Sequence, residues 1–184
     1  MAKFSTELFG SNLIVWNVEE GSKLYEQGFY GKPVGITKPK SSEFDVPLIL
    51  DLIEGLYLLE KGIIQVSQKP AKAKVGVRKL RDCARQIYRD FDLNYTVYSD
   101  LRDHGYIVLP GIKFGSTYAV YEKGPGIDHA PFLVSVKGSS EDITSTDIVR
   151  AGRLATTVRK RFIVAVPNLK TKGVQYLMFD WFKA

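Results

Sequence analysis

The sequence predicts a mixed α/β protein made of two small domains. Short stretches of alternating apolar and polar residues are interspersed with stretches whose apolar residues lie three or four apart. The composition, 45% hydrophobic and 25% charged, is that of a folded protein with a core. A chain of 184 residues is long enough for two domains of modest size. We place the boundary near residue 90, with an N-terminal α/β domain over 1–90 and a C-terminal domain with a mixed sheet over 91–184.

The first domain is predicted to begin with short strands and turns. Apolar and polar residues alternate from Asn12 to Val18, and glycines punctuate residues 21–35. The next segment contains Pro39 and two serines, which disfavour regular structure. We therefore expect an exposed basic loop that carries Lys38 and Lys40.

Two helices are predicted in the rest of the first domain. The earlier helix begins at Asp45 or a neighbour and ends near Gly62, and its apolar positions lie three or four apart: Leu48, Leu52, Leu56 and Leu59. A brief strand over 63–66 and a turn over 70–74 follow. Helical spacing then returns from Val77 to Tyr88, with basic residues mainly on the opposite side.

The second domain is predicted to begin with a short helix between an N-cap at Asp92 or Asn94 and a C-cap at Gly105. Strands are then expected over 106–109, 113–121 and 131–137, a helix over about 145–159, and strands over 162–166 and 174–181. This order indicates an α/β sandwich with a helix against one face of the sheet.

Charge and composition indicate what kind of partner the protein binds and which classes of protein it does not belong to. Lys and Arg total 26 against 20 Asp and Glu, which favours a polyanionic partner such as nucleic acid. Cys83 is the single cysteine, and no Cys/His cluster has the spacing of zinc ligands. No stretch approaches the roughly 18 apolar residues that a membrane span requires, and no signal peptide is recognisable. We expect a cytoplasmic, soluble protein with no membrane association.

Few residues could carry chemistry. The chain has no phosphate-binding glycine loop and no GxSxG motif, which disfavours ATP-dependent enzymes and serine hydrolases. The carboxylates Glu141, Asp142 and Asp147 are explained by helix capping, so no metal site is predicted. Of the two histidines, His104 lies at a helix end, whereas His129 lies in a loop between two predicted strands, a common place for catalytic groups.

Two runs of sequence carry a family resemblance. These are YTVYSDLRDHGYIVLPGIKFGSTYAVYEKGPGIDHAPFLV over 95–134 and DIVRAGRLATTVRKRFIVAV over 147–166. Together they resemble the C-terminal catalytic domain of the tRNA-splicing endonuclease family. GLYLLEKG over 55–62, with the helix that precedes it, is similar to the N-terminal domain of archaeal members. The resemblance thus covers essentially the whole chain.

This resemblance implies an endoribonuclease that needs neither metal nor cofactor and cleaves precursor tRNA at the exon–intron junctions of a bulge-helix-bulge fold. The products would be a 2′,3′-cyclic phosphate and a 5′-hydroxyl. It implies Tyr121 as general base, His129 as general acid and Lys160 as the cation that stabilises the transition state. Tyr118 is the alternative base, but the eight residues between Tyr121 and His129 and the strand-end position of Tyr121 match better.

Three further residues are expected to contact RNA on the strength of the resemblance. Arg153 lies seven residues before Lys160, two turns along one helix face, and matches a family arginine that stacks on an unpaired base. Lys38 and Lys40 lie in a loop that resembles an RNA-contacting insertion of crenarchaeal catalytic subunits.

One departure from the family pattern bears on assembly. Homomeric members carry an acidic loop between their last strands, whereas the matching segment here, PNLKTKG, contains Lys170 and Lys172 and no carboxylate. This favours a heterotetramer of two such chains with two paralogous structural subunits. Two alternatives remain open: a noncatalytic RNA-binding or assembly subunit, and a nuclease that requires a divalent metal, which cleavage in EDTA would exclude.

Overall fold

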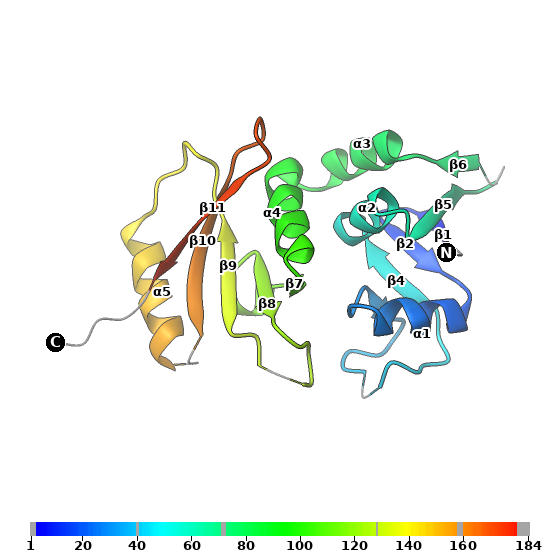
Figure 1. The fold of residues 1–184 in the computed structure, drawn as a ribbon, viewed down its shortest axis with the longest axis horizontal. Coiled ribbons are helices and arrows are strands. Elements are labelled where there is room, and N and C mark those ends of the chain that lie inside the picture. The colour runs from blue at the N-terminus through cyan, green and yellow to red at the C-terminus, as the bar shows by residue number, and fades with distance from the viewer. Residues whose placement is uncertain (1–2, 40, 71–72, 128, 158–159, 180–184) are drawn as a thin grey trace. The chain divides into compact units, whose positions relative to one another are not determined.

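The computed structural model describes residues 3–39, 41–70, 73–127, 129–157 and 160–179. The chain divides into two compact units, residues 1–91 and 92–184. Each unit contains one mixed sheet, and five α-helices lie in the described ranges (Figure 1). The predicted α/β fold class is confirmed. None of the helices in this part of the chain is long and apolar enough to cross a membrane.

The described residues of the first unit form a sheet in the order β3-β4-β2-β1-β5-β6. The pair β1 and β5 is parallel, and the other neighbouring pairs are antiparallel. The strands are β1 (Phe4–Phe9), β2 (Asn12–Val15), β3 (Lys32–Pro33), β4 (Leu48–Asp51), β5 (Ile64–Gln68) and β6 (Ala73–Val75). Alternate residues are buried along β1, β2 and β4, so one face of this sheet meets the core.

Helix α1 (Val18–Glu26) occupies a region where the sequence predicts strands and turns, and that prediction is wrong. The side chain of Asn17 caps the helix by accepting a hydrogen bond from the Glu20 backbone N–H at 3.0 Å. Gly21, which suggested a turn, is buried in the helix, where a Cβ atom would lie 3.1 Å from the Leu48 Cβ atom. The glycine therefore permits close packing of helix against strand.

The helix predicted from Asp45 is also corrected, because Leu48 lies in β4 and helix α2 (Leu52–Glu60) begins only after it. Asp51 and Glu54 form a capping box, in which each side chain accepts a hydrogen bond from the backbone N–H of the other residue. Helix α3 (Val77–Ile87) lies where it is predicted.

The second unit contains helix α4 (Phe91–Asp103) and a sheet whose described strands have the order β11-β10-β9-β8-β7. The pair β9 and β10 is parallel, and the other neighbours are antiparallel. The strands are β7 (Ile107–Pro110), β8 (Tyr118–Tyr121), β9 (Phe132–Val136), β10 (Arg161–Pro167) and β11 (Val174–Phe179). Helix α5 (Ser145–Thr157) lies in the connection between β9 and β10. Parallel strands need such a crossover, because a tight hairpin can join only antiparallel strands.

The two faces of this second sheet pack against different helices. Leu133 and Phe162 belong to a buried cluster with Ala151 of α5. Val134 and Ile163, one residue further along their strands, line a pocket with Leu101 of α4. Because neighbouring residues of a strand point to opposite faces, α5 covers one face and α4 the other.

The structure corrects two local predictions for this unit. The strand predicted over 113–121 is shorter, because residues Ile112–Phe114 form a 3₁₀ turn that ends at Gly115 in the left-handed conformation, with φ of 67°. The predicted helix over 145–159 is described only to Thr157, and Lys160 is not helical but directly precedes β10. Arg153 and Lys160 therefore do not share a helix face.

Candidate active site

Three strand ends meet at one end of the second sheet. Tyr121 is the last residue of β8, and β8 runs antiparallel to β9. Strand β9 runs parallel to β10, so the start of both strands lies beside the end of β8. His129 is three residues before β9, and Lys160 is one residue before β10. The sheet topology thus brings these three residues to the same end of the sheet.

Lys160 is held by contacts on both sides. Its ammonium group donates a hydrogen bond of 2.5 Å to the backbone carbonyl of Ala130, the residue next to His129. The same Nζ atom lies 5.1 Å from the centre of the Phe114 ring, within the range of a cation–π contact. The 3₁₀ turn that shortens the predicted strand carries this ring. Lys160 is therefore a half-buried cation fixed to the loop that carries His129.

Tyr121 lies on the α5-facing side of the sheet. It packs, partly buried, against the apolar cluster that contains Ala119, Ala130 and Ala151, and Phe114 packs against the same cluster. The ring of Tyr121 and the two residues that hold the Lys160 ammonium group thus share one cluster. His129 is exposed beside buried Ala130, so its imidazole is accessible from solvent.

Tyr118, the alternative base, has a different environment. It points to the α4-facing side of the sheet, is 5% exposed, and its ring lies 6.0 Å from that of Tyr98. Its hydroxyl donates a hydrogen bond of 3.0 Å to the backbone carbonyl of Asn94. A buried hydroxyl on the other face of the sheet is poorly placed to take a proton from a substrate that contacts Lys160.

The predicted RNA-contacting residues belong to other elements of the chain than the three strand ends. Arg153 is exposed on α5, two residues after buried Ala151. Two residues correspond to a rotation of about 200° around the helix, so Arg153 lies on the side of α5 opposite Ala151. Lys38 is exposed in the loop between β3 and β4 of the first unit. Lys40 lies outside the described residues.

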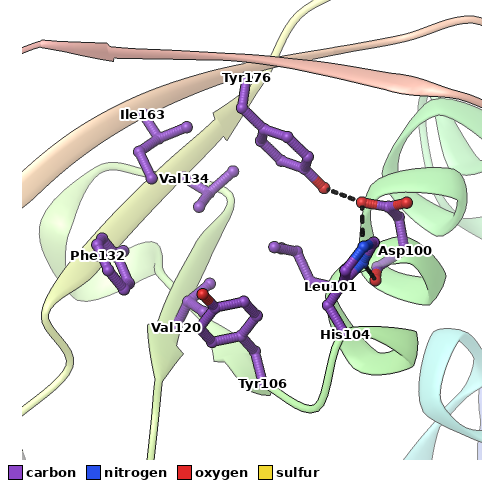
Figure 2. Close-up of a pocket in the computed structure, with 9 residues that line it drawn as sticks. All are labelled: Asp100, Leu101, His104, Tyr106, Val120, Phe132, Val134, Ile163 and Tyr176. Atoms are coloured by element: carbon purple, nitrogen blue, oxygen red, sulfur yellow. Dashed lines mark hydrogen bonds and ion pairs between the residues drawn. The ribbon is translucent and has the colours of Figure 1, made fainter.

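An apolar pocket of about 290 Å³ lies on the α4-facing side of the second sheet, and the sequence offered no signal for it. Figure 2 shows Phe132, Val134 and Ile163 on one side of it. The Tyr176 hydroxyl donates a hydrogen bond of 2.6 Å to the Asp100 carboxylate at its edge. Burial, and then this hydrogen bond, raises the pKa of Tyr176 above its usual value. The phenol is thus held in its neutral form.

His104 lies at the edge of the same pocket, on the α4-facing side of the sheet and so on the face opposite Tyr121 (Figure 2). Its Nδ1 atom is 2.7 Å from the backbone carbonyl oxygen of Asp100 and 3.7 Å from the carboxylate of that residue. This is the helix-end role predicted for His104, in which a polar or cationic group lies beside exposed carbonyls.

Of the three carboxylates predicted to cap a helix, Asp147 does so from the first turn of α5. Asp147 accepts hydrogen bonds from the backbone N–H and the hydroxyl of Thr144, at 3.0 and 2.8 Å. These bonds lower the pKa of Asp147, with a smaller contribution from Lys137. Glu141 accepts a bond from the backbone N–H of Gly138 at 3.1 Å. Within the described ranges, no group of three or more His, Cys, Asp or Glu side chains could hold a metal ion.

Comparisons with known proteins identify the family of the chain. Residues 91–176 match the model of the tRNA intron endonuclease catalytic C-terminal domain, and residues 4–81 match the model of the N-terminal domain of that family. A tRNA-splicing endonuclease of Hyperthermus butylicus is 46% identical over 176 residues, which cover 96% of this chain and 97% of the relative. Proteins of the same name from Saccharolobus islandicus and Saccharolobus solfataricus are 42% and 41% identical over 177 residues, with the same coverage.

Proposed function

This chain belongs to the tRNA intron endonuclease family, and on that premise we propose that it cleaves precursor tRNA at bulge-helix-bulge junctions with Tyr121, His129 and Lys160. The chain is an endonuclease with the catalytic domain of its family. The proposed residues are supported by one observation above all: the end of β8 and the starts of β9 and β10 lie together, with the Lys160 ammonium group bonded to the loop of His129.

The proposed reaction is an internal transesterification without a metal ion. Tyr121 takes the proton of the ribose 2′-hydroxyl while the 2′-oxygen forms a bond to phosphorus. The bond from phosphorus to the 5′-oxygen breaks, and His129 donates a proton to that oxygen. Lys160 stabilises the negative charge that develops on the non-bridging oxygens. The products are a 2′,3′-cyclic phosphate and a 5′-hydroxyl, and no other reactant is consumed.

The environment of each group supports its proposed role. The hydrogen bond to the Ala130 carbonyl fixes the Lys160 ammonium group beside the loop of His129, where its positive charge would stabilise phosphate oxygens. Exposed His129 can reach a substrate that approaches from solvent. Tyr121 lies at the end of β8 that is beside the start of β9, whereas Tyr118 is buried at the other end of β8.

Substrate binding would extend beyond the reacting phosphate. We assign Arg153 to stacking on an unpaired bulge base, because its guanidinium is exposed on α5 and planar. Lys38 and Lys40 would contact RNA phosphates from the loop between β3 and β4, and the exposure of Lys38 supports this. Recognition of this kind reads the shape of RNA and its splayed bases more than its sequence.

The partner proposed for this chain is a paralogous structural subunit in a heterotetramer of two plus two. The turn between β10 and β11 exposes Lys170 and Lys172, and the Asn168 side chain holds it by accepting two backbone N–H groups. Such a basic turn cannot replace an acidic docking loop, so the partner would supply that loop. The cytoplasm, where precursor tRNA is processed, is the proposed location.

The test is a single-turnover cleavage assay on a bulge-helix-bulge RNA in EDTA, with this chain co-expressed with a candidate structural subunit. We expect cleavage to the stated ends, and a loss of about 10²- to 10⁴-fold for His129→Ala with RNA affinity nearly unchanged. The matched control His104→Ala should cleave at the rate of the unsubstituted chain.

Three results would contradict parts of this proposal. Cleavage restored only by magnesium would show a metal-dependent enzyme. An unchanged rate for His129→Ala would remove the assigned acid. A fully active homotetramer, detected by mass measurement in solution, would remove the structural subunit.

A further inference from the structure

The sheet of the first unit has a second face that the proposed reaction does not use. One row of residues crosses all of its described strands in register: Lys32, Ile49, Ile14, Glu7, Ser67 and Lys74. Residues in register across neighbouring strands point to the same side. We call this side, with Phe9, Trp16 and Lys69, the outer face of the first sheet.

Both helices that pack on this sheet lie on its other side. A Cβ atom on Gly55 of α2 would overlap the side chain of Leu13, and one on Gly21 of α1 would lie 3.1 Å from the Leu48 Cβ atom. Leu13 and Leu48 are buried and alternate along their strands with Ile14 and Ile49. The outer face is therefore the side of the sheet opposite α1 and α2.

Two large aromatic side chains are exposed at opposite ends of the central strand pair of the outer face. Phe9 ends β1 and is 65% exposed, and Trp16 follows β2 and is 53% exposed. Phe9 is in register with Asn12, four residues before Trp16, so the backbones of Phe9 and Trp16 lie about 14 Å apart along the strands. The Trp16 indole N–H is satisfied by a hydrogen bond of 3.1 Å to Glu7, which orients its ring.

Lysines outnumber carboxylates on the outer face, where Asp51 is in register with Asn12 and caps α2. Lys32 and Lys74 are exposed at the two edge strands, β3 and β6. Lys69 lies 3.2 Å from the carboxylate of Glu7 and 5.8 Å from the centre of the Trp16 ring. The one carboxylate of this row thus has its own counter-ion, and the outer face presents two further ammonium groups to a ligand.

We propose that the outer face of the first sheet binds an unpaired stretch of the precursor RNA outside the bulge-helix-bulge junction. Exposed rings on a sheet stack on bases of any sequence, and flanking lysines contact the phosphates. This inference rests on the proposed function, which supplies RNA as the substrate. The surplus of lysines favours RNA over an apolar protein partner, whose interface core would be depleted in charge.

The experiment compares two RNAs in binding and cleavage by the assembled enzyme: a full precursor tRNA and a minimal bulge-helix-bulge duplex. The variant Phe9→Ala/Trp16→Ala should bind the precursor about fivefold or more weakly for each stacked base. Its affinity for the minimal duplex, and its cleavage rate on both RNAs at saturation, should be unchanged. Trp16→Phe, which keeps an aromatic ring, should retain most of the affinity.

A charge variant tests the lysines separately. Lys32→Ala/Lys74→Ala should reduce the dependence of precursor affinity on salt, by a slope of about 0.7 for each lost phosphate contact. The matched control is Lys23→Ala/Arg78→Ala, which removes two exposed charges from α1 and α3. That control should leave the slope unchanged.

Fluorescence separates a failure of this inference from a failure of the proposed function. The chain has two tryptophans, so Trp181→Phe leaves Trp16 as the single indole, and precursor binding should quench it. Quenching in a chain that does not cleave RNA would support the outer face and overturn the proposed function. Cleavage with unchanged precursor affinity in Phe9→Ala/Trp16→Ala would overturn the inference, and so would a change in subunit mass, which would indicate a protein interface.

Discussion

Both faces of the second sheet carry tyrosines, but the surroundings of these tyrosines differ between the two faces. On the α4-facing side, the hydroxyls of Tyr118 and Tyr176 are bonded to the Asn94 carbonyl and the Asp100 carboxylate. On the α5-facing side, Tyr121 and Lys160 lie at the end of the sheet, where solvent and a substrate can reach them. Residue type therefore does not mark a general base, whereas the face of the sheet and the strand end that the residue occupies do.

The largest expected effect is on the cleavage rate, and it tests the difference between Tyr118 and Tyr121. Tyr121→Phe should reduce single-turnover cleavage by about 10²-fold or more, because the ring remains and only the proton acceptor is lost. Tyr118→Phe should cleave at nearly the unsubstituted rate and lose only stability. Cleavage of bulge-helix-bulge RNA measures both variants, and the reverse order of rates would transfer the base role to Tyr118.

A stability measurement distinguishes the packing of the two faces. Leu133→Ala, on the α5-facing side, should lower the free energy of unfolding by about 2–5 kcal/mol because Leu133 is fully buried. Ile163→Ala should cost less, since Ile163 already lines a pocket and has fewer neighbours to lose. Denaturant unfolding followed by circular dichroism compares the two. Equal losses would mean that the pocket is filled in solution.

The hydrogen bond at the pocket edge should have a smaller effect. Tyr176→Phe should lower the free energy of unfolding by about 1 kcal/mol, because one hydrogen bond to a partly exposed carboxylate is lost. Cleavage should be unaffected, since the pocket lies on the face away from Tyr121. A loss of cleavage at full stability would indicate that the α4-facing side takes part in the reaction.

The smallest expected effect concerns the cap of α5 and depends on pH. The pKa of Asp147 is lowered in the folded chain, so its ionised form stabilises the fold above the unfolded pKa of about 4. Asp147→Asn should therefore cost about 0.5 kcal/mol at neutral pH. The difference from the unsubstituted chain should disappear as the pH falls through the folded pKa. A difference that persists at pH 2 would point to packing rather than charge.

Sequence patterns were reliable where one periodicity dominated the segment. Helix α3 and the order of elements after residue 105 follow their apolar spacing, because burial of one face selects a single periodicity. They failed for α1, where Gly21 suggested a turn. Only the packing of that glycine against Leu48, together with the Asn17 cap, favours a helix there.

Motifs and apolar periodicity lie along the chain, so the amino-acid sequence alone predicts the fold class, the family and the residue types available for chemistry. It named Tyr121, His129 and Lys160 but wrongly put Lys160 on the helix of Arg153. Only the tertiary structure decided which strand ends meet, which face each tyrosine occupies, and that Lys160 bonds the Ala130 carbonyl. The physical reason is that strand order and register arise from contacts between distant segments, which local spacing does not encode.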